Sequence, residues 1–308
     1  MKKKKVLLIV ILSLFVVSLT GCTRYVQVDK KVVTNEKNGQ RLVSNILCKP
    51  TDQDMIKLYE ENSIDLNKLP ECRNFKISSN GYEGLWTTIF VKPLAFLLVQ
   101  LTRLVKNAGL AVILITLLIR TLLYPITKKT AMQSENMEKA KKEINKVESK
   151  YAGKNSKEDQ MMHSQELMAV YKKYNISPLS GCVFALIQIP LFFAFYEAMN
   201  RLPLIFEGSF IGFDLGTSPL TAMTFGKWYY AIIVILVGVV TYFSFKLNKT
   251  ATNANNGLVD MQMMTYMSIG MITVASLSIS TSLALYWIFN SGFTVIQNII
   301  VKRGAKNA

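Results

Sequence analysis

The sequence predicts an all-α integral membrane protein with five transmembrane helices, an outer interfacial helix and a cytoplasmic helical hairpin. Of its 308 residues, 50% are hydrophobic, and the mean hydropathy is +0.26. The apolar residues gather in segments of about 20 residues, the helix length that crosses a hydrocarbon core about 30 Å thick. Lys and Arg outnumber Asp and Glu by 36 to 20, and many lie in loops predicted to be cytoplasmic.

Residues 1–21 are predicted to be a lipoprotein signal peptide. Lysines at 2–5 form its charged start and residues 6–19 its apolar region, which is short for a transmembrane helix. The ending Leu19-Thr20-Gly21-Cys22 resembles a bacterial lipobox, so we expect cleavage before Cys22 and a covalent lipid, palmitate, on its thiol. The alternative is an uncleaved anchor with an incidental cysteine. Because a multi-span bundle is already permanent in the membrane, this lipid would fix topology rather than add affinity.

Residues 22–84 are predicted to be an extracytoplasmic segment. It is polar with nearly balanced charge, and it is either a small folded cap or a tether. Cys48 and Cys72 lie in this exported segment, where disulfides persist, so a bridge between them can form. Cys182 starts a later apolar segment, where we expect a small packing residue.

Residues 85–105 are apolar but interrupted by Lys92-Pro93, Gln100 and Arg103. Such interruptions suit a helix lying on the outer leaflet better than one crossing the core. A first span at 109–127 then runs inward. The loop that follows, 128–177, carries eleven lysines against seven acids and therefore belongs in the cytoplasm. If 85–105 crossed the membrane, these lysines would lie outside.

The loop 128–177 is predicted to be a helical hairpin, with helices at 129–151 and 158–175. Ser156 precedes the second helix and is a suitable N-cap. Methionines give the hairpin a soft apolar face; they are Met132, Met137, Met161, Met162 and Met168. Two interpretations stay open: a solvated hairpin held by internal Glu–Lys pairs, and a docking surface for a partner.

The remaining apolar sequence predicts four more spans. One runs at 179–199 and the next at 227–246. Residues 261–301 would be about 61 Å long as one helix, twice the bilayer thickness, so they must be two spans hinged near 278–282. These last spans are 261–279 and 283–301. The core then ends at 303, and the tail, 304–308, is cytoplasmic.

Arg120 is the candidate functional residue, because a charge inside an apolar span is costly and points to function. The predicted spans contain one acid, Glu197, which belongs to the opposite interface. We therefore expect Arg120 to be hydrated or to await the negative charge of a ligand. The alternative is that it snorkels to the nearby headgroups. Helical spacing favours a wet cavity, because polar residues share its face: Thr116, Tyr124 and Thr127.

The last span carries a second polar stripe at helical spacing, made by Tyr286, Asn290, Thr294 and Gln297. Polar residues of other spans can join it: Gln188, Thr241 and Ser244. We expect these side chains to line one hydrophilic groove with Arg120. No metal site is expected, because the sequence has one histidine, His163, and no clustered Cys or Asp ligands.

Several motifs follow one another in a characteristic order over residues 85–303. They are Gly84-Leu85-Trp86, Ile119-Arg120 followed by Tyr124-Pro125, Tyr171-Lys172-Lys173-Tyr174, Ser177-Pro178-Leu179-Ser180-Gly181-Cys182, Gln188-Ile189-Pro190 with Phe195-Tyr196, and finally Tyr286-Trp287 and Gln297. On these motifs the chain resembles the YidC family of membrane protein insertases, in the five-span lipoprotein form typical of Gram-positive bacteria. Two positions depart from the family pattern: Ser177 replaces a frequent Asn, and Thr241 and Ser244 lie where a Gln is expected.

The resemblance implies a protein that inserts nascent integral membrane proteins and helps them fold, with no enzymatic reaction and no cofactor beyond the lipid on Cys22. It implies a groove open to cytoplasm and lipid with Arg120 at its depth. It also implies substrate contacts by Tyr286 and Trp287, for which packing or interfacial anchoring is the alternative role. The expected location is the bacterial plasma membrane, with a lipid-anchored N-terminus outside and a cytoplasmic C-terminus.

Expected partners are nascent membrane proteins, the lipid bilayer and, through 128–177, the Sec translocon, the ribosome or signal-recognition components. A small-solute anion transporter or channel using Arg120 fits less well, because no intramembrane acid is available for a proton relay and five spans cannot form equal halves. A further alternative is a lipoprotein receptor whose segment 23–84 binds a ligand. It predicts that deleting 23–84 abolishes function, whereas we expect the deletion to be tolerated. The net charge of +16 is spread along the chain without a nucleic-acid motif, so no nucleic-acid site is expected.

Overall fold

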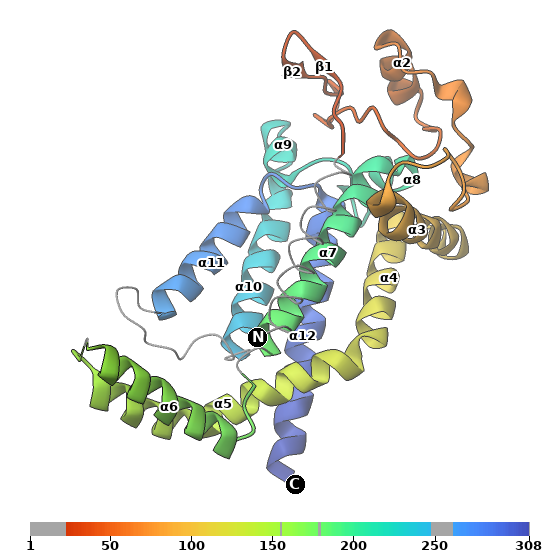
Figure 1. The fold of residues 1–308 in the computed structure, drawn as a ribbon. Helices are drawn as coiled ribbons and strands as arrows, with labels where there is room; N and C mark the ends of the chain where they lie inside the picture. The colour runs from red at the N-terminus through yellow and green to blue at the C-terminus, as the bar shows by residue number, and fades with distance from the viewer. Residues whose placement is uncertain (1–22, 155, 178–179, 248–260, 308) are drawn as a thin grey trace. The chain divides into compact units, whose positions relative to one another are not determined.

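The computed structural model describes residues 23–154, 156–177, 180–247 and 261–307, and Cys22 with the predicted signal peptide lies outside them (Figure 1). The described residues form two compact units. Among the described residues, unit 1 draws on 23–119, 186–237 and 273–289. Unit 2 draws on 120–154, 156–177, 180–185, 238–247, 261–272 and 290–307. Most elements are helices, as predicted, so the chain is an all-α membrane protein.

Residues 23–84 fold into a small cap in unit 1. Strands β1 (Gln27–Val28) and β2 (Lys31–Val32) pair antiparallel. Helix α2 (Gln53–Glu61) begins at its N-cap Asp52, and short turns follow at η1 (Leu66–Lys68) and η2 (Cys72–Asn74). The cap has a core of buried side chains: Leu42, Val43, Ile46, Met55 and Tyr59.

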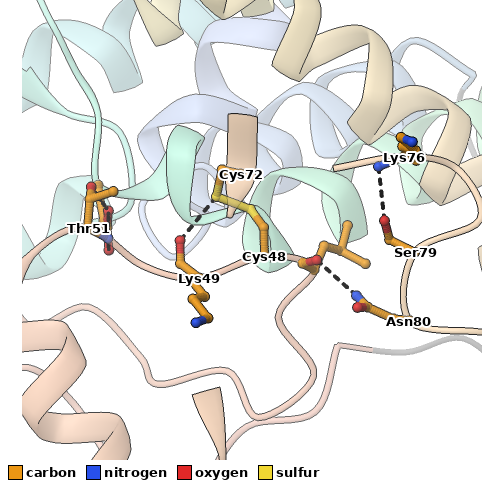
Figure 2. Close-up of a disulfide and its surroundings, with 9 residues drawn as sticks. Cys48, Lys49, Thr51, Cys72, Lys76, Ser79 and Asn80 are labelled. Carbon is orange, nitrogen blue, oxygen red and sulfur yellow. Dashed lines mark hydrogen bonds between the residues drawn. A yellow bond between two sulfur atoms is a disulfide. The ribbon is translucent and has the colours of Figure 1, made fainter. Parts of the chain in front are cut away.

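A disulfide joins Cys48 to Cys72 across a sequence separation of 24 (Figure 2). Both cysteines are buried, together with Leu47 and Phe75, in the same apolar cluster as side chains of the following helices. Because a cross-link restricts the unfolded chain, a loop of this length is expected to add about 3 kcal/mol to the free energy of unfolding. The disulfide therefore fixes the part of the cap that packs on the helices.

Helix α3 (Lys92–Val105) follows a π-helical turn, η3 (Thr87–Val91). Its buried face includes Leu94, Leu98 and Val99, whereas Leu97 and Leu104 are exposed. One face therefore packs within unit 1, while the other exposes leucines together with Arg103.

Helix α4 spans Ala108–Leu122, and helix α5 begins at Tyr124 and ends at Tyr151. The structure thus differs from the span predicted at 109–127, because residues 124–127 belong to α5. Pro125 explains the break. Proline lacks an N–H and fits the first turn of a helix, so the chain starts a new helix beside it.

Helix α5 and helix α6 (Lys157–Lys173) form the hairpin of unit 2. The hydroxyl of Ser156 accepts from the backbone N–H of Asp159 and N-caps α6, as predicted. The two helices enclose a cluster of buried side chains: Met137, Ala140, Ile144 and Ile176. Salt bridges Lys150–Glu166 and Lys173–Glu143 join them at the surface.

Helix α7 spans Ser180–Arg201 and helix α10 spans Ala231–Leu247. Short elements connect them: α8 (Pro203–Phe206), β3 (Ser209–Phe210), β4 (Phe213–Asp214), α9 (Pro219–Thr224) and η4 (Trp228–Tyr230). Helix α11 covers Met261–Ala275 and helix α12 covers Thr281–Asn307. Helix α11 ends earlier than the predicted 279, and α12 continues beyond the predicted 301.

Among the described residues, three helical stretches are long and apolar enough to cross a membrane: Thr87–Val105, Trp228–Leu247 and Thr281–Gly304. The broken pair of α4 and α5 passes the same test if it is taken together. At 22 residues, α7 would be about 33 Å long, which also matches the bilayer. The stretch containing α3 thus has the length of a span as well as the polar interruptions of an interfacial helix.

Candidate functional site

Arg120 lies in the last turn of α4, two residues before that helix ends. Its side chain is buried, with 3% of the residue exposed. Its Nε donates a hydrogen bond to the Asn290 side-chain oxygen, Oδ1, over 2.5 Å. The partner of the guanidinium is thus a neutral amide from α12, Asn290, which the sequence placed in the same predicted groove.

A second polar pair lies seven residues further along both segments. The Thr127 hydroxyl of α5 donates to the side-chain oxygen of Gln297 over 3.1 Å. Since seven residues are about two helical turns, Asn290 and Gln297 present their amides on one face of α12. Both are buried, at 4% exposure. Unit 2 therefore contains a buried polar cluster, which we define as Arg120, Thr127, Asn290 and Gln297.

The structure buries more polar residues of unit 2 than the sequence analysis named. Thr241 and Thr294 are buried as well, while Tyr124 and Ser244 are half-buried. Four buried polar residues were missed: Thr130, Ser134, Ser291 and Asn298. A helical signal was available for them, because Thr127, Thr130 and Ser134 are spaced three and four residues apart on α5.

The remaining predicted groove residues belong to unit 1. Gln188 of α7 donates to the Tyr286 hydroxyl over 3.2 Å, and Tyr286 stacks on Phe195 with ring centroids 4.2 Å apart. Trp287 meets Phe192 edge-on at 5.7 Å. The Thr116 hydroxyl instead donates to the carbonyl of Val112 in its own helix, over 2.6 Å. Thr116 is thus satisfied locally, while the aromatic residues pack between α7 and α12.

Unit 1 also contains a buried charge cluster that the sequence analysis missed. It consists of Glu83 of the cap, Lys92 of α3, and Glu197 and Arg201 of α7. Lys92 is fully buried, Arg201 is 1% exposed, and Glu197 is 3% exposed. Glu197 accepts from the Trp86 indole over 2.8 Å and lies 3.6 Å from Arg201. The Glu197 carboxylate therefore has a hydrogen-bond partner and an ion-pair partner within unit 1.

The polar cluster of unit 2 suits recognition of an anion. A guanidinium supplies several N–H donors, while amide and hydroxyl groups replace hydration. Among the described residues, no group of three His, Cys, Asp or Glu side chains is placed to hold a metal ion. The side chains of the cluster themselves offer charge pairing and hydrogen bonding.

Comparisons with known proteins match most of the chain. The family model described as 60Kd inner membrane protein matches residues 100–308, which excludes the cap. The membrane protein insertase YidC of Oceanobacillus iheyensis is 32% identical over 75% of this chain and 88% of that protein. The membrane protein insertase MisCA of Bacillus subtilis is 34% identical over 70% of this chain and 79% of that protein. A solved structure described as an active YidC insertase is 20% identical with a TM-score of 0.47, and the similarity covers 80% of this chain and 50% of the other.

Proposed function

The chain belongs to the YidC family of membrane protein insertases, and we propose that it inserts nascent membrane proteins through a polar groove in which Arg120 receives an acidic substrate tail. The observation that carries the proposal is the burial of Arg120 beside the neutral side-chain amide of Asn290. The proposed groove also includes Tyr124, Thr241 and Ser244 of unit 2. Insertion of this kind makes or breaks no covalent bond, so we propose neither a catalytic residue nor a cofactor beyond the lipid.

Burial makes Arg120 a strong attractor. Two unit charges 4 Å apart gain about 1 kcal/mol in water, but about 4 kcal/mol at an effective dielectric constant of about 20. A short acidic tail can therefore enter the inner leaflet without losing all favourable electrostatic contacts. Its apolar helix meets lipid alongside, and partitioning of that helix into the bilayer drives release.

Asn290 defines the resting state of this site. An amide oxygen satisfies the guanidinium without neutralising its charge, whereas a carboxylate would form a stronger, charge-assisted bond. An incoming substrate carboxylate can therefore displace the Asn290 oxygen from Arg120. Without substrate, the Arg120 guanidinium thus has a hydrogen-bond acceptor in Asn290. It keeps its positive charge and can therefore bind an acidic tail.

The test is insertion by Arg120→Ala in cells depleted of the wild-type protein, with Arg303→Ala as control because Arg303 is exposed near the end of α12. Substrates with acidic and with neutral tails are compared by protease protection. We expect the acidic substrates to insert at least about tenfold less efficiently, which corresponds to about 1.4 kcal/mol. Equal insertion of both substrate classes by Arg120→Ala would refute the role of Arg120.

Tyr286 and Trp287 are proposed to contact the substrate helix from unit 1. Trp287 is only half-buried, so part of its ring is available. A photocrosslinker at 287 should capture nascent membrane proteins during insertion. A crosslinker at the fully buried Leu283 serves as control, and equal capture at both positions would contradict a specific contact.

We propose five spans, with α3 at the outer interface and both the hairpin and the C-terminus in the cytoplasm. The lysines of 128–177 support this orientation through the positive-inside rule. A thiol reagent that cannot cross the membrane should therefore reach a cysteine at 68 but not at 172.

Cys22 is proposed to carry palmitate after signal-peptide cleavage. Labelling with radioactive palmitate should be lost in Cys22→Ala.

The hairpin is proposed to dock a partner of protein synthesis or export, either the Sec translocon, the ribosome or signal-recognition components. Two methionines of α6 support this, because Met161 and Met168 are 61% and 53% exposed and lie seven residues apart on one face. Crosslinkers at these positions should capture one of these partners, and capture of none of them would contradict the proposal.

A further inference from the structure

The cap supplies hydrogen-bond and ion-pair partners to a fully buried cation, Lys92 of α3. Lys92 Nζ donates to the carbonyl oxygens of Ser79 and Gly81 over 2.7 and 2.5 Å, and it lies 3.4 Å from a carboxylate oxygen of Glu83. Removing water from an ammonium group is costly unless it is paired and hydrogen-bonded. The burial of Lys92 in α3 is thus compensated by the cap.

The same carboxylate also binds α7. Arg201 pairs with the other oxygen of Glu83, and its Nε donates to the carbonyl of Asn45 over 2.7 Å. The backbone N–H of Leu47 donates in return to the carbonyl of Arg201 over 2.8 Å. One cap residue, Glu83, therefore joins a buried cation of α3 to a buried cation of α7.

Further contacts tie the cap to the rest of unit 1. The Glu207 carboxylate accepts from the Thr51 N–H over 2.9 Å, and the Thr217 hydroxyl donates to the carbonyl of Asn38 over 2.8 Å. The hydroxyls of Tyr25 and Tyr196 lie 3.1 Å apart beside a polar cavity of about 80 Å³. These contacts and the disulfide indicate a fixed arrangement rather than a tether.

We propose that residues 23–84 are a permanently docked clamp that holds α3 to α7 through Glu83, and that insertion requires this clamp, contrary to the expectation from the sequence that deletion of 23–84 is tolerated. The charges balance within the cluster, since Glu83 and Glu197 face Lys92 and Arg201. The matched family model begins at residue 100, so the clamp lies outside the residues that it matches. The requirement for insertion rests on the proposed function, whereas docking does not.

The experiment is chymotrypsin cleavage of the full-length protein in liposomes, because Tyr59 and Phe75 are buried cleavage sites of the cap. Glu83→Gln keeps the shape but leaves Lys92 and Arg201 undercompensated. We expect cleavage at these sites to become at least about tenfold faster. The control is Asp54→Asn, which breaks the exposed Lys37–Asp54 pair of the cap and should change cleavage less than about threefold.

A double variant, Glu83→Gln with Lys92→Met, separates the effect of charge balance from the effect of a lost contact. Methionine keeps most of the apolar part of the lysine side chain, and the double variant leaves the cation Arg201 facing the anion Glu197. The double variant should regain most of the protection lost in Glu83→Gln. Additive effects of the two substitutions, or protection unchanged in Glu83→Gln, would overturn the clamp.

Insertion assays on the same variants test whether insertion requires the clamp. Insertion should fall several-fold in Glu83→Gln and recover in the double variant. If the cap is cleaved readily in Glu83→Gln while insertion is normal, the requirement is wrong. Arg120→Ala should leave the cap protected, so failure of the groove and failure of the clamp give different results.

Discussion

Arg120 Nε donates to Asn290 Oδ1 over 2.5 Å, between residues separated by 170 positions in the chain. This bond places a permanent positive charge against a neutral acceptor in a site with little exposure. The choice of amide over carboxylate matters, because a resident acid would cancel the attraction on which substrate binding depends. It also yields a substitution with a distinctive expected effect.

Asn290→Asp should block the site from within. The new carboxylate would pair with Arg120, so acidic substrates should insert at least about tenfold less well, as in Arg120→Ala. Protease protection of acidic and neutral substrates measures the effect. The matched control is Asn298→Asp, which places an acid at an equally buried position of the same helix. An equal defect in both variants would point to the general cost of a buried acid.

The bond between Thr127 and Gln297 should show a measurable coupling. Thr127→Val and Gln297→Leu each remove one partner, and a double-mutant cycle should give an interaction of about 0.5–1.5 kcal/mol. The measurement is denaturant or thermal unfolding in detergent. Thr116→Val is the control, because the Thr116 hydroxyl donates to the Val112 carbonyl of its own helix, whereas the Thr127 hydroxyl reaches Gln297 of α12 as well as local carbonyls. A coupling near zero would mean that the pair adds nothing to stability.

Glu207 should make cap stability depend on pH. Burial raises the pKa of its carboxyl above the ordinary value, against the opposing effect of the Thr51 hydrogen bonds. The folded state thus holds the proton more tightly than the unfolded state, whose glutamate pKa is about 4.3. The stabilisation is present below that value and is lost as pH rises through the raised folded pKa.

Thermal unfolding of the wild type and Glu207→Gln between pH 4 and pH 8 measures this dependence. Relative to the variant, the wild type should lose stability as pH rises. A difference that is constant, or that grows in favour of the wild type at high pH, would contradict the sign.

The hairpin should depend on its apolar contacts more than on its salt bridges. Ile144 is 1% exposed, so Ile144→Ala should cost about 2–5 kcal/mol of local stability. Glu166→Gln breaks an exposed pair with Lys150 and should cost less than about 1 kcal/mol. Trypsin cleavage of the hairpin in the full-length protein compares them. A larger effect of Glu166→Gln would support a hairpin held chiefly by charges.

Local signals predicted the local structure well. Ser156 was identified as an N-cap from its place before a charged helix, and it caps α6. The end of α4 was missed, because the apolar run continues past Leu122 while Pro125 already starts the next helix. Hydropathy reports where a segment is apolar, but it does not report where a helix breaks within it.

Partners that are distant in sequence could not be predicted in this way. The stripe containing Asn290 was recognised, but its bond to Arg120 depends on how two segments 170 residues apart come together. Lys92 shows the same limit. In the sequence it is a polar interruption that suits an interfacial helix, whereas in the structure it is a buried cation whose partners come from the cap.

The pairing of Glu83 imposes an order on the synthesis of this protein. Lys92 follows Glu83 closely in the chain, so their ion pair can form early, but Arg201 is made 118 residues later. Until α7 has been translated and placed, the Glu83 carboxylate can pair with Lys92 but not with Arg201. The clamp can therefore be completed only once the chain has been built as far as Arg201 and α7 has been placed beside the cap.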